Sequence, residues 1–210
     1  MSPDIPDPRN PYSMDEDCTN CPALVESRTQ VVHGYGDPTA DVIVLGSAPT
    51  PGADRTGVPF TGDETGETLQ EILGAVGLSD SPPDSTEPEL REVYLTYVTR
   101  CHHPDRSATE EERHNCEGYR TAELRRINPE LIVAVGQSAL EALAFEYTME
   151  SADELDVTAE HATTIQGRGF EILPMIEPAT ASESELTAFR EHFAAELDRD
   201  YRQTKGQRRK

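Results

Sequence analysis

The chain of 210 residues has almost no lysine, since only Lys205 and Lys210 occur and arginine supplies the remaining basic residues. Asp and Glu number 40 against 18 Lys and Arg, which gives a formal net charge of -22. Such an acidic chain argues against DNA binding, because contacts to phosphates need cationic side chains. At molar salt, however, where the Debye length falls to about 3 Å, an acidic surface stays hydrated and its self-repulsion is screened. We therefore expect a halophilic protein.

Long apolar runs and a basic leader are missing as well. No apolar stretch approaches the roughly 18 residues of a membrane span, and residues 1–17 are acidic where a signal peptide would be basic. We expect a cytoplasmic protein that acts as a monomer and contacts no membrane. Four prolines and no apolar period predict a flexible acidic arm over residues 1–17. Residues 200–210 hold the only basic block and predict a tail that adds affinity for phosphates.

Four short apolar runs rich in β-branched residues predict buried strands. They span residues 41–46, 93–98, 131–136 and 170–173. Helical patterns separate them, including a charged helix behind a Thr109–Glu112 capping box and a last helix capped by Ser182 and Glu185. This alternation predicts a three-layer α/β/α sandwich around a short, mostly parallel four-stranded sheet. The domain is expected over residues 18–199, with ligands at the carboxyl ends of the strands.

Four cysteines in a reducing compartment are typical of metal ligands or reactive thiols rather than of disulfides. Cys18 and Cys21 form a C-x-x-C turn, Cys101 follows a predicted strand, and Cys116 lies on the next helix. Thiolates from a turn, a strand end and a helix can form a tetrahedral set, which suits either a [4Fe–4S] cluster or zinc. Spacing alone leaves both open.

Several segments, in the same order, resemble the iron–sulfur uracil-DNA glycosylases, the fourth and fifth families of their superfamily. The resemblance covers about residues 18–180. Its main segments are Cys18-Thr-Asn-Cys-Pro-Ala-Leu24, Gly46-Ser-Ala-Pro49, Asp54-Arg-Thr-Gly-Val-Pro-Phe-Thr-Gly-Asp63, Tyr94-Leu-Thr96 and Ile127-Asn-Pro129. It implies a [4Fe–4S] cluster on the four cysteines and DNA with a flipped or damaged base as the partner. It also implies hydrolysis of the N-glycosidic bond of uracil or another deaminated base, a reaction of base-excision repair.

The resemblance assigns roles to single residues. Asp54 matches the catalytic residue that positions or activates the attacking water, and Phe60 matches the aromatic residue that stacks on the flipped base. Gly46, Ser47 and Ala48 open a loop of small residues whose backbone N–H groups can approach the base. Without the resemblance, the loop is equally typical of a strand-to-helix turn, Asp54 of a cap, and Phe60 of the core.

Other positions depart from the family pattern. Glu177 occupies the catalytic position where the second motif has histidine, and Tyr97 replaces an asparagine that reads the pyrimidine edge. The Tyr97 phenol would either donate to the base or fill the pocket with its ring. Ser47 stands where the fourth family has glutamate, and His102 and His103 either line the DNA groove or lie on the surface.

These departures leave two hypotheses about function. The first is an active DNA glycosylase. The second is a catalytically weak or inactive module of the same fold that binds damaged, abasic or single-stranded DNA. A redox protein would follow from the cluster alone, but it would leave the glycosylase-like loop unexplained.

Overall fold

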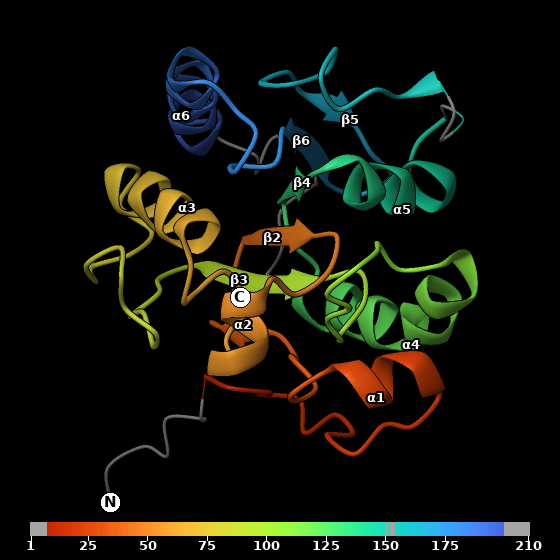
Figure 1. The fold of residues 1–210 in the computed structure, drawn as a ribbon. Helices are drawn as coiled ribbons and strands as arrows, with labels where there is room; N and C mark the ends of the chain where they lie inside the picture. The colour runs from red at the N-terminus through yellow and green to blue at the C-terminus, as the bar shows by residue number, and fades with distance from the viewer. Residues whose placement is uncertain (1–7, 150, 152–153, 200–210) are drawn as a thin grey trace, which may run out of the picture.

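The structure is a computed structural model that describes residues 8–149, 151 and 154–199 (Figure 1). A six-stranded sheet with the strand order β1-β3-β2-β4-β6-β5 forms its centre. The inner four strands run parallel, and they are Val42–Gly46 (β2), Val93–Tyr97 (β3), Leu131–Val135 (β4) and Glu171–Met175 (β6). Each inner strand coincides closely with one of the apolar runs, so the mostly parallel sheet is confirmed.

Two short strands border this parallel centre. Tyr35–Gly36 (β1) pairs antiparallel with β3, and Ile165–Gln166 (β5) pairs antiparallel with β6. The predicted number of four strands is therefore wrong. A strand of two residues is too short to show the apolar alternation by which strands are recognised in a sequence.

Helices cover both faces of the sheet, as Figure 1 shows. The main ones are Glu64–Ala75 (α3), Glu110–Ile127 (α4), Gln137–Tyr147 (α5) and Glu183–Leu197 (α6). Side chains of a strand alternate between the faces, so Val44 packs in the cluster that contains Phe189 of α6, while Ile43 packs with Leu124 of α4. The three-layer α/β/α sandwich is thus confirmed.

Two predicted helix starts have the expected caps. Thr109 and Glu112 form a complete capping box at α4, and Ser182 and Glu185 form another at α6. Two shorter helices, Pro22–Ser27 (α1) and Pro51–Thr56 (α2), complete the helices that concern the site. Within the described residues, no helix has the length and apolar character to cross a bilayer.

The described part of the N-terminal arm, residues 8–17, contacts the edge of the sheet. The Pro8 carbonyl accepts from Gly36 N at 3.0 Å, and the Tyr12 hydroxyl donates to the Pro38 carbonyl at 3.0 Å. The proposed domain limits at residues 17 and 200 stay predictions, and the basic tail lies outside the described residues.

Candidate functional site

The four cysteines come from three separate segments and line one small cavity. Cys21 caps α1, Cys101 follows β3, and Cys116 lies in α4; these three are buried, whereas Cys18 is half-buried. Among the described residues, no three His, Cys, Asp or Glu side chains come close enough together to hold one metal ion. The fold gathers the four cysteines around one cavity.

Nitrogen donors face two of these sulfur atoms. Arg28 Nη1 donates to Cys101 Sγ at 3.1 Å, and Arg28 Nη2 donates to the Cys18 carbonyl at 2.6 Å. Asn115 Nδ2 donates to Cys21 Sγ at 3.5 Å. Burial raises the pKa of the Cys101 thiol, and the Arg28 guanidinium opposes that rise. Such donors favour sulfur in its thiolate form, which is the form that ligates metals.

A buried ion pair stands beside the cavity. Arg100 and Glu123 are each 1% exposed, and Arg100 Nη2 lies 2.6 Å from Glu123 Oε2. Glu123 also accepts from the Tyr94 hydroxyl at 3.0 Å and from Thr96 Oγ1 at 2.7 Å. Arg100 lines the cysteine cavity, and its Nε atom is buried without a hydrogen-bond partner in the described chain. Because removal of one partner would leave a buried charge, at a cost of about 3–5 kcal/mol, this pair fixes α4 to the segment after β3.

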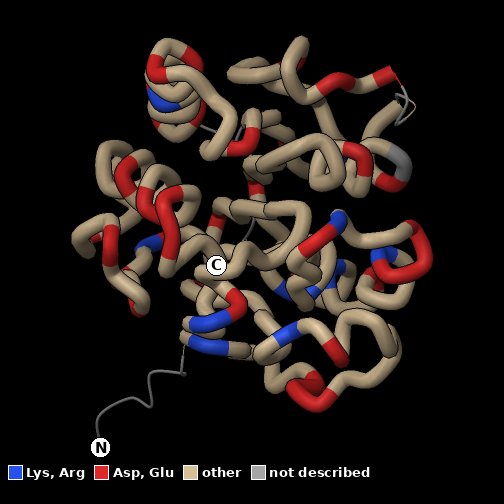
Figure 2. Tube along the Cα trace, viewed as in Figure 1, with Lys and Arg blue, Asp and Glu red and all other residues tan. Residues whose placement is uncertain are grey.

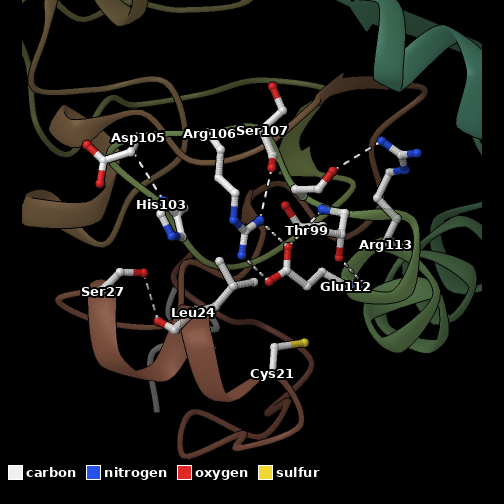
Figure 3. A network of polar contacts seen from close by, with 12 residues as sticks. Cys21, Leu24, Ser27, Thr99, His103, Asp105, Arg106, Ser107, Glu112 and Arg113 are labelled. Atoms are coloured by element: carbon white, nitrogen blue, oxygen red, sulfur yellow. Dashed lines mark hydrogen bonds and ion pairs between the residues drawn. The ribbon is translucent and has the colours of Figure 1, made fainter.

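The loop between Cys101 and α4 is held by a second, more exposed pair (Figure 3). Arg106 donates from Nη1 and Nη2 to Glu112 at 2.7 and 2.8 Å, a bidentate geometry. Hydrogen bonds from Arg106 lower the pKa of Glu112 to about 2. The loop that follows the third cysteine therefore has a defined course up to the start of α4.

A cleft of about 530 Å³ opens at the carboxyl ends of the parallel strands. Its lining comes from the loop after β2, the start of α3 and the segment between β6 and α6, and it includes Thr50, Pro51, Asp63, Glu64, Pro178, Ala179 and Glu183. No arginine or lysine of the described chain is among the lining residues. The described lining of the cleft is therefore acidic.

Three predicted site residues meet where β2 and β3 end. The rings of Phe60 and Tyr97 lie 4.7 Å apart at 37°, and Phe60 N donates to the Tyr97 hydroxyl at 2.9 Å. A Cβ atom on Gly46 would lie 2.6 Å from the Phe60 ring and 2.8 Å from the Tyr97 ring, so only glycine permits this approach. Both rings are buried, and burial raises the pKa of Tyr97. Tyr97 thus packs against the residue that the resemblance assigned to base stacking.

Glu177 follows β6 and lies close to residues that follow β2 and β4. Its Oε1 atom is 3.5 Å from Ser47 Oγ, and a Cβ on Gly136 would lie 2.3 Å from the same oxygen. Gly136 is the N-cap of α5, so the Glu177 carboxyl group sits at the start of that helix. Burial raises the pKa of Glu177, and the Ser47 hydroxyl opposes that rise. Of the predicted loop residues, the structure brings Ser47 to Glu177, while Ala48 is half-buried in the same loop.

Asp54 has a different environment. Its side chain is buried in α2, and Thr29 N donates to its two carboxylate oxygens at 3.0 and 2.9 Å. Gln30 Nε2 also donates to the Asp54 carbonyl at 3.0 Å. Asp54 is not among the residues that line the cleft. These hydrogen bonds join α2 to the segment after α1. The role of Asp54 in positioning a water molecule stays a prediction.

Comparison with known proteins gives the family. A sequence profile described as the uracil DNA glycosylase superfamily matches residues 33–199. The chain belongs to this superfamily. It is 36% identical over 156 residues to the Type-5 uracil-DNA glycosylase of Thermus thermophilus, covering 64% of this chain and 71% of the relative.

Further relatives of both types align with the chain. The Type-5 uracil-DNA glycosylase of Pyrobaculum aerophilum is 29% identical over 181 residues, which are 77% of this chain and 78% of the relative. The Type-4 uracil-DNA glycosylase of Thermotoga maritima is 36% identical over 124 residues, which are 59% of this chain and 58% of the relative. The predicted resemblance to the fourth and fifth families of the superfamily is therefore confirmed.

Within this superfamily fold, sequence reasoning assigned no role to Asp63 and no contact partner to His102. Asp63 lines the cleft, caps α3 and accepts from Gly52 N at 2.8 Å; its place at the end of the Asp54–Asp63 motif was the available signal. His102 Nδ1 lies 2.8 Å from the Pro49 carbonyl. Apart from its position next to Cys101, no sequence signal pointed to this contact.

The charges of the superfamily member are unevenly placed. Figure 2 shows acidic residues on most elements, whereas most arginines lie around α1, α2 and α4. Arg55 on α2 and Arg9 beside it are exposed. Arg55 lies on the same helix as Pro51, which lines the cleft, whereas neither Arg55 nor Arg9 is among the lining residues.

Proposed function

We propose that the protein is a DNA glycosylase that hydrolyses the N-glycosidic bond of uracil or another deaminated base in DNA. The observation that carries the proposal is that the loop after β2 and the segment after β6 line one cleft at the carboxyl edge of the sheet. Those are the two segments where the resemblance places the family's motifs. The activities in the names of the Type-4 and Type-5 relatives support the same reaction.

The acidic cleft suits a base that has left the duplex better than it suits the backbone. A glycosylase extrudes the base, reads its pairing edge and cleaves a bond whose transition state carries positive charge on the sugar. Backbone N–H groups of the loop after Gly46 would hold the base, and Asp54 would position the attacking water. Phosphates would contact the arginine side around α2, where Arg55 is exposed.

Glu177 determines how well the departing base is stabilised. An ionised carboxylate near a departing anion is repulsive, by several kcal/mol in a dry pocket. Because burial raises the pKa of Glu177, the neutral acid becomes more populated, and that form can donate a hydrogen bond. We infer that excision uses neutral Glu177 and is slow on uracil.

We further propose that Cys18, Cys21, Cys101 and Cys116 hold a [4Fe–4S] cluster. All four line one cavity, and two of their sulfur atoms accept N–H donors. Four cysteines around one cavity provide the four thiolate ligands that such a cluster needs. When bound, the cluster supplies Fe–S bonds that join the turn before α1, the loop after β3, and α4.

The alternative is a catalytically weak or inactive module that binds damaged, abasic or single-stranded DNA. One observation favours it, which is the Tyr97 ring packed 4.7 Å from Phe60, where the family stacks the base. The Tyr97 hydroxyl accepts from Phe60 N, so the ring is held in place. The Tyr97 ring therefore occupies the side of Phe60 that it faces.

One experiment separates the two functions. Oligonucleotides that carry uracil, hypoxanthine or only normal bases are incubated with the protein at molar KCl, as single strands and duplexes, and then cleaved with alkali. A glycosylase yields breaks at the modified base and none in the normal strand. Binding by fluorescence anisotropy without any breaks would establish the binding module instead.

A further inference from the structure

The loop that opens the cleft is fastened along one side to residues 98–102. Val98 N donates to the Gly46 carbonyl at 2.8 Å, and Thr99 N donates to the Ser47 carbonyl at 3.2 Å. These bonds continue the pairing of β2 with β3 past the end of the strands. The next contact is made by a side chain: His102 Nδ1 lies 2.8 Å from the Pro49 carbonyl. A carbonyl only accepts, so Nδ1 carries the proton.

His102 is itself held on the side of the cysteines. Its carbonyl accepts from Ser27 Oγ of α1 at 3.0 Å. The preceding residue is Cys101, whose sulfur accepts from Arg28. The imidazole is half-buried between these contacts and the loop. Its position is therefore set by the same segments that line the cysteine cavity.

The hydrogen bond from His102 to the Pro49 carbonyl also orients the backbone of the following residue. The Pro49–Thr50 peptide is planar, so fixing its carbonyl also fixes the direction of the Thr50 N–H. Thr50 lines the cleft, and its backbone interacts with the Tyr97 hydroxyl, which in turn accepts from Phe60 N. A chain of contacts thus runs from His102 to the ring pair beside the cleft.

From this arrangement we propose that His102 is a positioning residue, which holds the loop of residues 46–50 in the geometry needed for base excision through its Nδ1 bond to Pro49. The proposal rests on the proposed function for its kinetic consequence, but its structural part does not depend on activity. A displacement of about 1 Å in a positioning element can cost up to a hundredfold in rate, so loss of one such bond is expected to be visible.

Two variants separate the hydrogen bond from the bulk of the ring. His102→Leu keeps a side chain of similar size without a donor, whereas His102→Asn places an amide N–H close to the position of Nδ1. The matched control is His103→Leu, because the half-buried His103 ring accepts from Asp105 N in its own loop. We expect His102→Leu to lower kcat on the best modified oligonucleotide roughly tenfold, with KM changed less than about twofold. His102→Asn should recover most of the rate, and His103→Leu should match wild type.

Iron content and hydrogen exchange complete the test. In anaerobically purified protein, all three variants should keep the wild-type iron content. Amide exchange in peptides covering residues 46–52 should speed up several-fold in His102→Leu and not in His102→Asn, a readout that holds even if no base is excised. Unchanged exchange in His102→Leu, or equal defects in the Leu and Asn variants, would overturn the proposal. Absence of excision in wild type, with the exchange difference present, would overturn only the proposed function.

Discussion

The cysteine cavity and the cleft are joined by residues 98–102, yet their polar groups are arranged in opposite ways. Around the cavity, nitrogen donors face sulfur, and Arg100 is paired with Glu123. The described lining of the cleft holds carboxylates and no cation, and beside it Glu177 has one long hydrogen bond to Ser47. Donors and an ion pair thus surround the cavity, whereas substituted residues stand beside the cleft at positions where the resemblance places groups that read the base. Cofactor binding and catalysis can therefore be tested independently in this molecule.

The largest expected effect concerns the cavity. Wild-type protein purified without oxygen should contain about four irons and absorb broadly near 400 nm, and Cys101→Ser should lose both, because all four thiolates are needed to close one cluster. Iron analysis and absorbance spectra measure this directly, and Asp54→Asn serves as the control that should keep its iron. One zinc and no iron in the wild-type protein would refute the cluster.

The next effect separates chemistry from structure at Asp54. Asp54→Asn should lower kcat at least about a hundredfold, the usual scale for a positioned acid or base. An Asn oxygen can still accept from Thr29 N, so the melting temperature and iron content should hold. If the rate is unaffected, Asp54 serves only to join α2 to the segment after α1.

A smaller effect, an increase in the rate of uracil excision, is expected from a substitution of Glu177. Glu177→His restores a donor toward the departing base and should speed uracil excision roughly tenfold. The double change with Tyr97→Asn should add to the gain, because it also frees the face of Phe60. Single-turnover rates on a uracil oligonucleotide measure both. Fast wild-type excision that both changes slow would show that Glu177 works in a different catalytic arrangement.

The smallest effect is on stability. Burial raises the pKa of Glu177, so the folded state favours the protonated acid, and the wild type loses stability as pH rises through that raised pKa. Glu177→Gln escapes this loss. Its melting temperature should equal that of wild type well below the ordinary carboxyl pKa and exceed it by up to a few degrees at pH 8. A difference that is constant from pH 3 to pH 8 would contradict the assignment.

Sequence patterns were sufficient to predict those elements whose structure depends on residues close together in the sequence. The inner strands carry continuous apolar runs, and the boxes at Thr109 and Ser182 need only residues three positions apart. The edge strands escaped prediction because a pair of residues such as Tyr35–Gly36 has no periodicity, and their pairing depends on the strand beside them.

The candidate site was predictable in part for a related reason. Cysteine is chemically distinctive, so the four sulfur ligands could be proposed from residue type and spacing. The partners of the site could not, since Arg100 meets Glu123, and His102 meets Pro49, only after the chain has folded. Likewise, a glutamate in place of histidine identifies an altered position, but only the fold shows that Glu177 lies at the start of α5 against Gly136.

The two edge strands have a consequence for solubility. An exposed strand edge offers unpaired N–H and C=O groups to a second molecule, and charge repulsion normally discourages such pairing. In concentrated salt, that repulsion reaches only about 3 Å, so net charge no longer keeps molecules apart. Here each edge of the sheet is a strand of two residues, and Arg9 bridges to Tyr35 on the outer side of β1. The geometry of the sheet thus limits edge-to-edge aggregation under conditions in which the acidic surface cannot.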